Sequence, residues 1–350
     1  MKAGIVGGGI IGRLIAFLLY QKQWQVTLFD QNKNNCSSVA AGLLTPISEL
    51  EKSEISIFQL GMEALKGHWP TILAQLDEPV YFQRQGSLVV AHAQDQAELA
   101  SYIRLISNKL NSTTFFKYLT PNAISTLEPE LSLKHNGYYF PDEGQLDSQR
   151  IMDVLKKNLL TKIKWIDNQF VEAIKPEKII TSKTVYSFDR IFDCRGLGAR
   201  SMLSNLRGVR GELLWLHAPE ITITRPIRLL HPRYRLYIVP RPQHIYLLGS
   251  TEIESEDNSA ISVRTTLELL TAAYSLQPKF SEARLVKTAT ACRPAFNNHL
   301  PKISYSKGIF IINGLYRHGF LVAPSLAEDV MRFIDKGIAS VHYPHLWESL

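Results

Sequence analysis

The sequence predicts an α/β (α+β) fold in which a Rossmann-like dinucleotide-binding domain is interleaved with a second domain built on a mixed, largely antiparallel β-sheet. The first reason is the stretch 2–30, which reads as strand, glycine-rich turn, amphipathic helix, strand and acid. This is the order of a mononucleotide-binding βαβ unit. The second reason is another glycine-rich turn at 195–199 that directly follows an apolar run, and the third is the set of strand patterns between 211 and 251.

The three glycines of the first turn have different tasks. Gly7 permits a tight strand-to-helix turn, Gly9 lets the backbone approach a pyrophosphate, and Gly12 lets the helix lie close on the strand. The pyrophosphate is expected at the helix N-terminus, where free N–H groups and the macrodipole favour negative charge. Asp30 follows Gly12 by 18 residues, near the separation that reaches a ribose hydroxyl. A carboxylate there would repel a 2′-phosphate, so NADP is disfavoured, and NAD and FAD both remain open.

Further elements follow in order along the chain. The small-residue stretch 39–46 lets the backbone pass close to a bulky group, either a tightly packed helix or a flat cofactor. Helices are predicted at 54–76, 95–110, 123–127, 148–160, 263–276 and about 324–334. Strands are predicted at 86–91, 137–147 (ending in a turn), 164–166, 170–175, 178–181, 190–194, 211–216, 235–241, 245–251, 285–294 and 308–312. We assign 1–80, 140–208 and 300–350 to the nucleotide-binding domain and 81–139 and 209–299 to the substrate domain.

Composition narrows the class of protein. The chain has 350 residues, enough for two or three well-buried substructures, and its 45% hydrophobic and 20% charged content is that of a globular protein. Thirty-nine Lys and Arg against 32 Asp and Glu give a formal charge of +7. The basic residues are scattered, which favours a solvated surface over nucleic-acid binding, although such a surface still attracts an anionic substrate.

The cysteines and the hydropathy pattern indicate a cytoplasmic protein. Cys36, Cys194 and Cys292 show no CxxC spacing and no complete disulfide framework, so we expect a reducing compartment. No apolar run approaches the roughly 18 to 20 residues that span a bilayer. Arg13 interrupts the N-terminal apolar run, which the glycine spacing explains better than a signal peptide does. His231 and His244 are not spaced with acids or cysteines as metal ligands are, and we expect no metal.

Eight short motifs, taken in order, cover nearly the whole chain. They are the glycine motif around 7–12 and the segments 38–43 (SVAAGL), 141–147 (PDEGQLD), 193–199 (DCRGLGA), 237–241 (YIVPR), 249–251 (GST), 293–294 (RP) and 317–324 (RHGFLVAP). In this order the chain resembles the D-amino-acid oxidase superfamily of flavoproteins. Within it, the chain is most similar to the glycine oxidases of thiamine biosynthesis and their sarcosine-oxidase-like relatives.

The resemblance implies a cofactor and a set of site residues. The cofactor is FAD, whose isoalloxazine ring would reach from the nucleotide-binding domain to the edge of the substrate sheet. Arg293 would hold a substrate carboxylate, Tyr237 would add a hydroxyl donor, and Arg317 would complete the catalytic site beside the N1–O2 edge of the flavin. The cofactor-binding residues implied are Gly7, Gly9, Ile10, Ile11, Gly12, Asp30, Ser38, Ala41, Gly42, Leu43, Val171, Cys194, Gly196, Gly198, Arg293, Arg317, His318, Gly319, Phe320 and Leu321.

The implied reaction oxidises the C–N bond of a small amino acid or N-methylated amine. In this superfamily a hydride passes from the carbon that bears the amine to flavin N5, water hydrolyses the imine, and dioxygen reoxidises the flavin to give peroxide. Two alternatives stay open. One is a maturation flavoprotein that modifies a side chain of a partner protein or a modified nucleic-acid base. The other is a dehydrogenase that passes electrons to a quinone.

Three residues depart from the pattern of the glycine oxidases: Glu252, Cys292 before Arg293, and Leu315 after Gly314. Three others have ordinary structural explanations. Glu252 lies near where those enzymes carry an apolar residue that faces the substrate. Burying an unpaired carboxylate is costly, so Glu252 either points to solvent or serves a cationic or larger substrate. Arg293 also fits a structural ion pair, and Tyr237 fits an aromatic on a half-buried strand. We expect His318 to be a hydrogen-bonding loop residue rather than a base.

Overall fold

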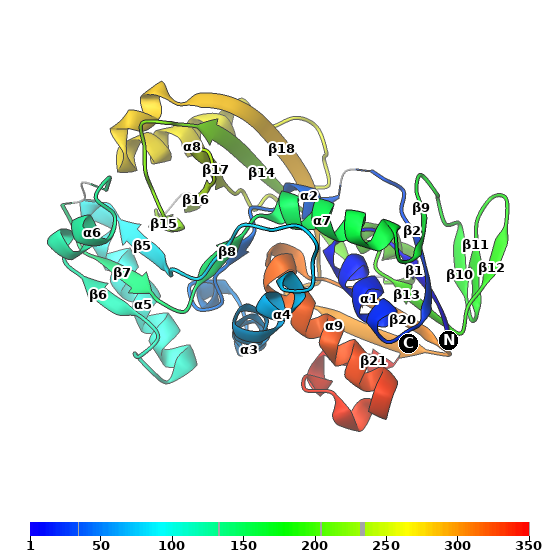
Figure 1. Cartoon of the computed structure of the whole chain (residues 1–350). Coiled ribbons are helices and arrows are strands. Elements are labelled where there is room, and N and C mark those ends of the chain that lie inside the picture. Colours follow the sequence, from blue (N-terminus) through cyan, green and yellow to red (C-terminus); the bar gives the residue numbers. More distant parts are fainter. Residues whose placement is uncertain (34, 132–133, 204, 232–234, 350) are drawn as a thin grey trace.

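The computed structural model describes residues 1–33, 35–131, 134–203, 205–231 and 235–349. Two large β-sheets dominate it, one toward each side of the view in Figure 1. Strands far apart in the sequence lie side by side in the sheet on the right, which is why blue, green and orange segments meet there.

The first sheet has seven strands in the order β21-β19-β20-β13-β1-β2-β9. Its members are β1 (Lys2–Val6), β2 (Gln25–Phe29), β9 (Lys164–Ile166), β13 (Arg190–Asp193), β19 (Lys302–Ser306), β20 (Ile309–Asn313) and β21 (Trp347–Ser349). The five strands from β20 to β9 are parallel, whereas β19 runs antiparallel to β20. Parallel strands covered on both faces are rich in apolar residues, as the nearly continuous apolar runs of β1 and β20 show.

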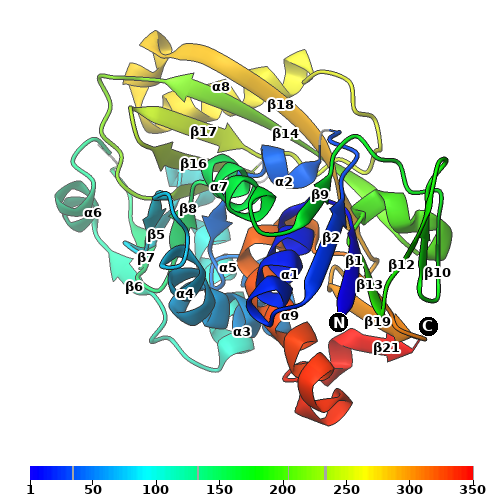
Figure 2. The same cartoon turned by 45° about the vertical axis from the view of Figure 1, so that its right-hand side comes forward.

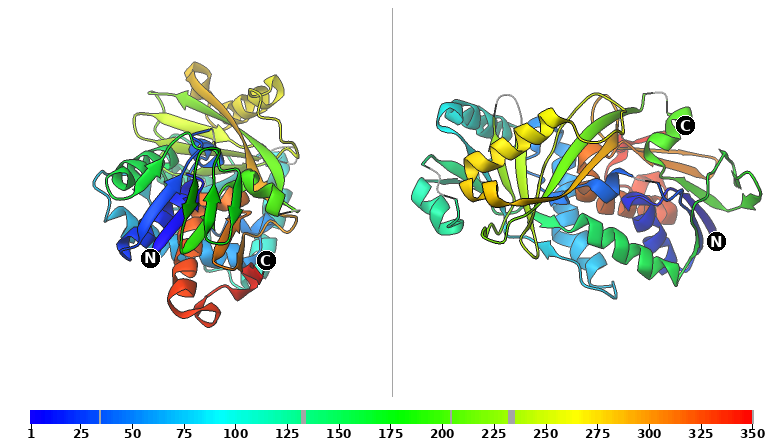
Figure 3. Two further views of the ribbon diagram at one scale, coloured as in Figure 1. Left: turned by 90° about the vertical axis from the view of Figure 1, so that its right-hand side faces the viewer. Right: turned by 90° about the horizontal axis from the view of Figure 1, so that it is seen from above.

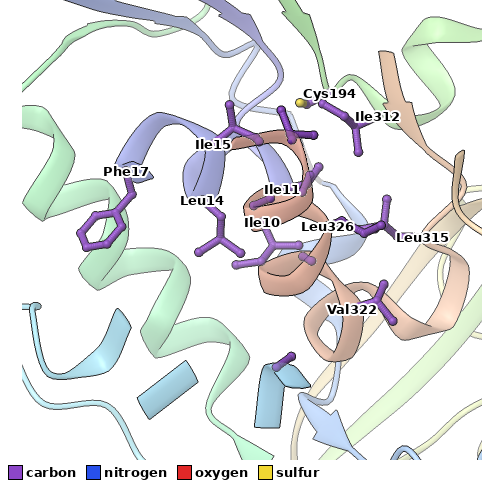
Figure 4. Close-up of a cluster of buried hydrophobic side chains, with 14 of the residues drawn as sticks. Ile10, Ile11, Leu14, Ile15, Phe17, Cys194, Ile312, Leu315, Val322 and Leu326 are labelled. Atoms are coloured by element: carbon purple, nitrogen blue, oxygen red, sulfur yellow. The ribbon is translucent and has the colours of Figure 1, made fainter. Parts of the chain in front are cut away.

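Helices cover one face of this sheet. They are α1 (Ile10–Gln21), α7 (Ser148–Leu160) and α9 (Gly319–Lys336). Figure 4 shows Ile10 and Leu14 of α1 and Val322 and Leu326 of α9 gathered in one apolar cluster near Ile312 of β20. Beside the sheet stand the small antiparallel strands β10 (Ala173–Lys175), β11 (Lys178–Ile180) and β12 (Val185–Ser187), seen at the right of Figure 2.

The second large sheet has eight strands in the order β18-β14-β17-β16-β15-β5-β7-β6. Its members are β5 (Ser87–Ala91), β6 (Lys117–Leu119), β7 (Gly137–Phe140), β14 (Arg207–His217), β15 (Ile227–Leu230), β16 (Arg235–Arg241), β17 (Ile245–Gly249) and β18 (Arg284–Ala295). All its pairings are antiparallel except β15 with β5. The helix α8 (Val263–Leu276) packs across it, as the view from above in Figure 3 shows, and α5 (Gln96–Leu110) and α6 (Pro121–Leu127) flank the β5 end.

A short three-stranded sheet joins the two halves of the molecule. It consists of β3 (Leu43–Leu44), β8 (Gly144–Leu146) and β4 (Phe82–Gln83). Arg241 at the end of β16 is buried against it and donates hydrogen bonds to the carbonyl oxygens of Ala41 and Leu146 and to Gln145 Oε1. Arg241 therefore ties the eight-stranded sheet to the small-residue stretch that follows α2 (Cys36–Val39).

A buried carboxylate fixes the segment that follows β3. Glu143 is fully buried and accepts hydrogen bonds from the backbone N–H groups of Ile47 (2.9 Å) and Ser48 (2.6 Å) and from the hydroxyl of Ser87. Burial raises the pKa of Glu143 to about 7, against the opposing effect of these donors. The segment 45–48 is thereby held in place just before Glu49.

The structure corrects several predicted boundaries. The helix expected at 54–76 consists of α3 (Ile55–Glu63), a π-helical turn (Ala64–His68) and α4 (Trp69–Leu73). The strand expected at 137–147 is two strands in different sheets, and that expected at 170–175 is only β10. The last helix begins at Gly319 rather than near Pro324, because Trp69 Nε1 donates to the Phe320 carbonyl (2.9 Å), replacing the N–H that Pro324 lacks. Within the described residues, every helix is too short or too polar to cross a bilayer.

Candidate functional site

Two adjoining cavities lie between the carboxyl ends of the parallel strands and the eight-stranded sheet. The larger has a volume of about 1210 Å³ and runs from the first glycine turn to β18. The smaller, of about 100 Å³, lies between the small-residue stretch, β16 and the start of α9. Both are lined by Ile10, Cys36, Ser37, Val39, Ala291, Tyr316 and Gly319, so they form one continuous site.

The first glycine turn is shaped by close backbone contacts. Gly7 has φ +112°, and a Cβ there would stand 2.5 Å from the Cys194 carbonyl oxygen at the end of the neighbouring strand. A Cβ on Gly12 would stand 2.0 Å from the Gly7 carbonyl oxygen, so Gly12 packs directly beneath the turn. Gly12 is the one predicted site residue that lines neither cavity. Gly9 is the N-cap of α1 and lines the larger cavity, and the first helical N–H, of Ile10, donates to Ser37 Oγ (3.1 Å) at the same cavity.

Asp30 stands at the edge of the same turn. Its carboxylate is nearly buried, accepts a hydrogen bond from Asn32 N–H (3.0 Å) and lies against Gly8, where a Cβ would come within 2.0 Å of Oδ2. Arg13 approaches from within α1, with Nη2 at 4.0 Å from Asp30 Oδ2 and Nε donating to the Gly8 carbonyl (2.6 Å). Asp30 is thus held at the cavity wall beside a buried positive charge.

The remaining predicted residues divide between the two cavities. Gly7, Gly9, Ile11, Asp30, Ser38, Val171, Cys194, Gly196 and Gly198 line the larger one. Ala41, Gly42, Leu43, Tyr237, Arg293, Arg317, His318, Phe320 and Leu321 line the smaller one, and Ile10 and Gly319 line both.

Arg293 is held against the backbone of the neighbouring strand. Its Nη1 donates to the Thr251 carbonyl (3.0 Å) and its Nη2 to Ser250 Oγ (2.8 Å). The guanidinium lies over Gly211, where a Cβ would be 2.1 Å from Nη2. Tyr237 shares Ser250 as a hydrogen-bonding partner, and burial raises the pKa of its hydroxyl even though the Arg293 charge opposes the rise. Arg293 and Tyr237 therefore present an orientated cation and a protonated hydroxyl to one small cavity.

A chain of ion pairs also lines the smaller cavity. Arg317 Nε lies 3.1 Å from Glu49 Oε2, while its Nη1 donates to Glu252 Oε1. Glu49 also pairs with Arg228, and Glu252 with Lys52 (3.0 Å). Glu252 thus lines the cavity while its side chain stays partly exposed to solvent. Although burial alone would raise it, the charges of Arg317 and Lys52 lower the pKa of Glu252 to about 2.

His318 is not placed to act as a base. It is buried, and its Nε2 accepts a hydrogen bond from Arg317 Nε at 3.3 Å. Burial and then the adjacent Arg317 charge lower its pKa to about 3, which keeps the ring neutral. This agrees with its expected role as a hydrogen-bonding residue.

Several residues that line the smaller cavity were not predicted as site residues. Among them, Glu49, Gly211, Arg228 and Ser250 contact the charged side chains of the site. Glu49 and Arg228 carry no motif of their own. Gly211 and Ser250 lay within recognised segments, but nothing local in the sequence shows that Arg293 rests on one and donates to the other.

The residues that line the two cavities fit FAD. The N-terminus of α1 at the larger cavity, the turn at Gly7 without room for a Cβ and the buried Asp30 match the needs of a pyrophosphate and a ribose. The larger cavity exceeds the roughly 300–1,000 Å³ usual for small-molecule pockets, which suits an extended dinucleotide. The small side chains at Ala40, Ala41 and Gly42 leave space along the smaller cavity for a flat ring.

Comparisons with known proteins agree with this geometry. The model of the DAO family, described as FAD dependent oxidoreductase, matches residues 2–332. A putative thiamine biosynthesis oxidoreductase, ThiO, of Rhizobium etli is 34% identical over 95% of this chain and 96% of its own length. A glycine oxidase of Geobacillus kaustophilus is 23% identical over 91% of this chain and 89% of its own length.

Solved structures show the same fold. The crystal structure of glycine oxidase from Geobacillus kaustophilus superposes with a TM-score of 0.85 at 22% identity, covering 99% of this chain and 98% of that one. An iminodiacetate oxidase from a Chelativorans species superposes with a TM-score of 0.85 at 20% identity, covering 99% of both chains.

Proposed function

Because the chain belongs to the DAO family of FAD-dependent oxidoreductases, we propose that it oxidises the C–N bond of a small amino acid or N-methylated amine, with glycine and sarcosine as first candidates. The observation that carries the proposal is the pairing of Arg293 with Tyr237 around Ser250. A planar cation beside a hydroxyl donor suits a carboxylate. The name of the Geobacillus relative, glycine oxidase, supports an amino-acid substrate.

The chain would supply orientation rather than acid–base chemistry. Bound FAD supplies the two-electron acceptor and, through its reoxidation, the reduction of dioxygen to hydrogen peroxide. Arg293 would fix the substrate carboxylate, and because Thr251 and Ser250 already hold the guanidinium, little reorganisation is needed on binding. The C–N bond becomes an imine that water hydrolyses. His318 Nε2 already accepts a hydrogen bond from Arg317, and its lowered pKa makes the ring a weak base, so we assign it no proton transfer.

The two cavities suggest how the cofactor would be held. We propose that Gly7, Gly9 and Asp30 hold its ADP part and that the start of α9 faces its flavin part. The N-cap of α9 makes no side-chain hydrogen bond, and the first turn, at Gly319, lines both cavities. The positive end of that helix would favour negative charge on a reduced ring.

The proposal is tested by mixing the purified holoenzyme anaerobically with glycine, sarcosine, proline or D-alanine. We expect the flavin absorbance to bleach with at least one of the four, and admission of air to restore it with formation of peroxide. Bleaching that air reverses slowly and a quinone reverses rapidly would identify a dehydrogenase instead. No bleaching with any small amine would refute the proposed substrate class.

Arg293→Lys provides the matched variant. Lysine keeps the charge but loses the planar fork, so KM for the amino acid should rise while the FAD spectrum stays unchanged. An unchanged KM would remove Arg293 from substrate binding.

A further inference from the structure

We propose that Glu252 is a specificity-determining residue that reserves the smaller cavity for amines with a single carboxylate, because it occupies Arg317. This inference rests on the proposed function and deepens it. It concerns the series of ion pairs that lines the same cavity as Arg293.

These ion pairs form a continuous series of alternating charges. From outside to inside, the side chains of Lys52, Glu252, Arg317 and Glu49 are 43%, 30%, 12% and 10% exposed. Glu252 bridges Lys52 and Arg317, and Glu49 bridges Arg317 and Arg228. Arg317 therefore has a carboxylate on each side and no unmatched charge to offer an incoming anion.

Arg293 differs from these arginines. Three arginines line the cavity among the described residues, and two of them, Arg228 and Arg317, pair with glutamates. Arg293 instead donates only to neutral acceptors, the Thr251 carbonyl and Ser250 Oγ. A substrate carboxylate can pair with Arg293 without breaking an ion pair. A second carboxylate would have to displace Glu252 from Arg317 and would meet the repulsion of two glutamates.

Glu252 is also placed to act together with the carboxylate site. It directly follows Thr251, whose carbonyl holds Arg293, so one short segment positions both the cation that accepts the substrate and the anion that blocks Arg317. Because Lys52 and Arg317 already satisfy its carboxylate, Glu252 is not an acceptor waiting for a cationic substrate.

The test compares Glu252→Gln with Glu254→Gln in the holoenzyme. Glu254 lies on the same segment and also pairs with an arginine, Arg207 (2.6 Å), but it does not line the cavity. Binding of acetate and of malonate is measured by perturbation of the flavin spectrum, and turnover is measured with sarcosine and with iminodiacetate, its analogue bearing a second carboxylate.

We expect wild type and Glu254→Gln to bind malonate no more tightly than acetate. Both should have a higher kcat/KM for sarcosine than for iminodiacetate. In Glu252→Gln the affinity for malonate relative to acetate should rise about tenfold, and the kcat/KM ratio of iminodiacetate to sarcosine should rise with it. An unchanged malonate-to-acetate ratio in Glu252→Gln would refute the inference, as would a wild type that already favours malonate. If wild type oxidises no amine, the proposed function fails, and the binding comparison still decides the role of Glu252.

A second variant separates the pairing of Arg317 from general surface charge. Lys52→Met removes the outer partner of Glu252 but leaves Glu252 paired with Arg317, so the affinity for malonate relative to acetate should not rise. A gain equal to that of Glu252→Gln would show that the ion pair with Arg317 is not the cause.

Discussion

Replacing Gly211 with alanine should misplace the proposed carboxylate-binding group without touching the cofactor. The new Cβ would stand 2.1 Å from Arg293 Nη2 and 2.4 Å from Cζ, so the guanidinium has to move. Movement costs at least one of its hydrogen bonds to Thr251 (3.0 Å) and Ser250 (2.8 Å). A hydrogen bond to a charged group is worth about 1.5–3 kcal/mol, which corresponds to about a 10- to 150-fold loss in kcat/KM.

The assay is steady-state peroxide formation with the best substrate of wild type, with the flavin spectrum recorded on the same samples. Gly67→Ala is the control, because a Cβ there meets no heavy atom within 4 Å, and it should leave kcat/KM unchanged. A Gly211→Ala enzyme with wild-type kcat/KM would refute the argument that the Arg293 guanidinium needs the space left by the missing Cβ of Gly211. Loss of the flavin spectrum together with activity would point to misfolding, and Arg293→Lys then tests the same group without crowding.

Three further predictions concern the cofactor and the framework. Asp30→Ala should weaken FAD binding about 10- to 150-fold in titrations of the apoprotein, because a charged acceptor for the ribose is lost, whereas alanine at the exposed Asp189 should not. Arg241→Met should lower the free energy of unfolding by about 3–5 kcal/mol in urea, since it leaves buried acceptors at Ala41, Gln145 and Leu146 unpaired, while Arg264→Met at an exposed site should not. Burial raises the pKa of Glu143 from 4.5 to about 7, so the stability from its protonation is full below pH 4.5 and is lost as pH rises through 7. The free energy of unfolding of wild type should therefore fall by up to about 3 kcal/mol between pH 4.5 and 7, and Glu143→Gln should remove this fall. If the free energy of unfolding changes equally with pH in the variant and in wild type, the raised pKa does not belong to Glu143.

Much of the fold could be predicted because its signals are local. The turn at Gly7 and Gly9, the apolar runs of the parallel strands and the small-residue stretch before β3 each act through neighbouring residues. The length of α9 could not be predicted. Pro324 normally marks a helix start, and only the distant Trp69 side chain, by binding the Phe320 carbonyl, lets the helix begin a turn and a half earlier.

The sequence by itself determined the nucleotide-binding unit, the FAD-dependent family and the candidates Arg293 and Tyr237, since these depend on short contiguous motifs. Only the tertiary structure decided what those residues meet. Gly211 lies beneath Arg293 because β14 pairs with β18, and Glu49 and Glu252 reach Arg317 from segments about 200 residues apart. Contacts between strands and between distant charges leave no pattern along the chain. The environment of Arg317, on which the proposed substrate selection depends, therefore exists only in the folded protein.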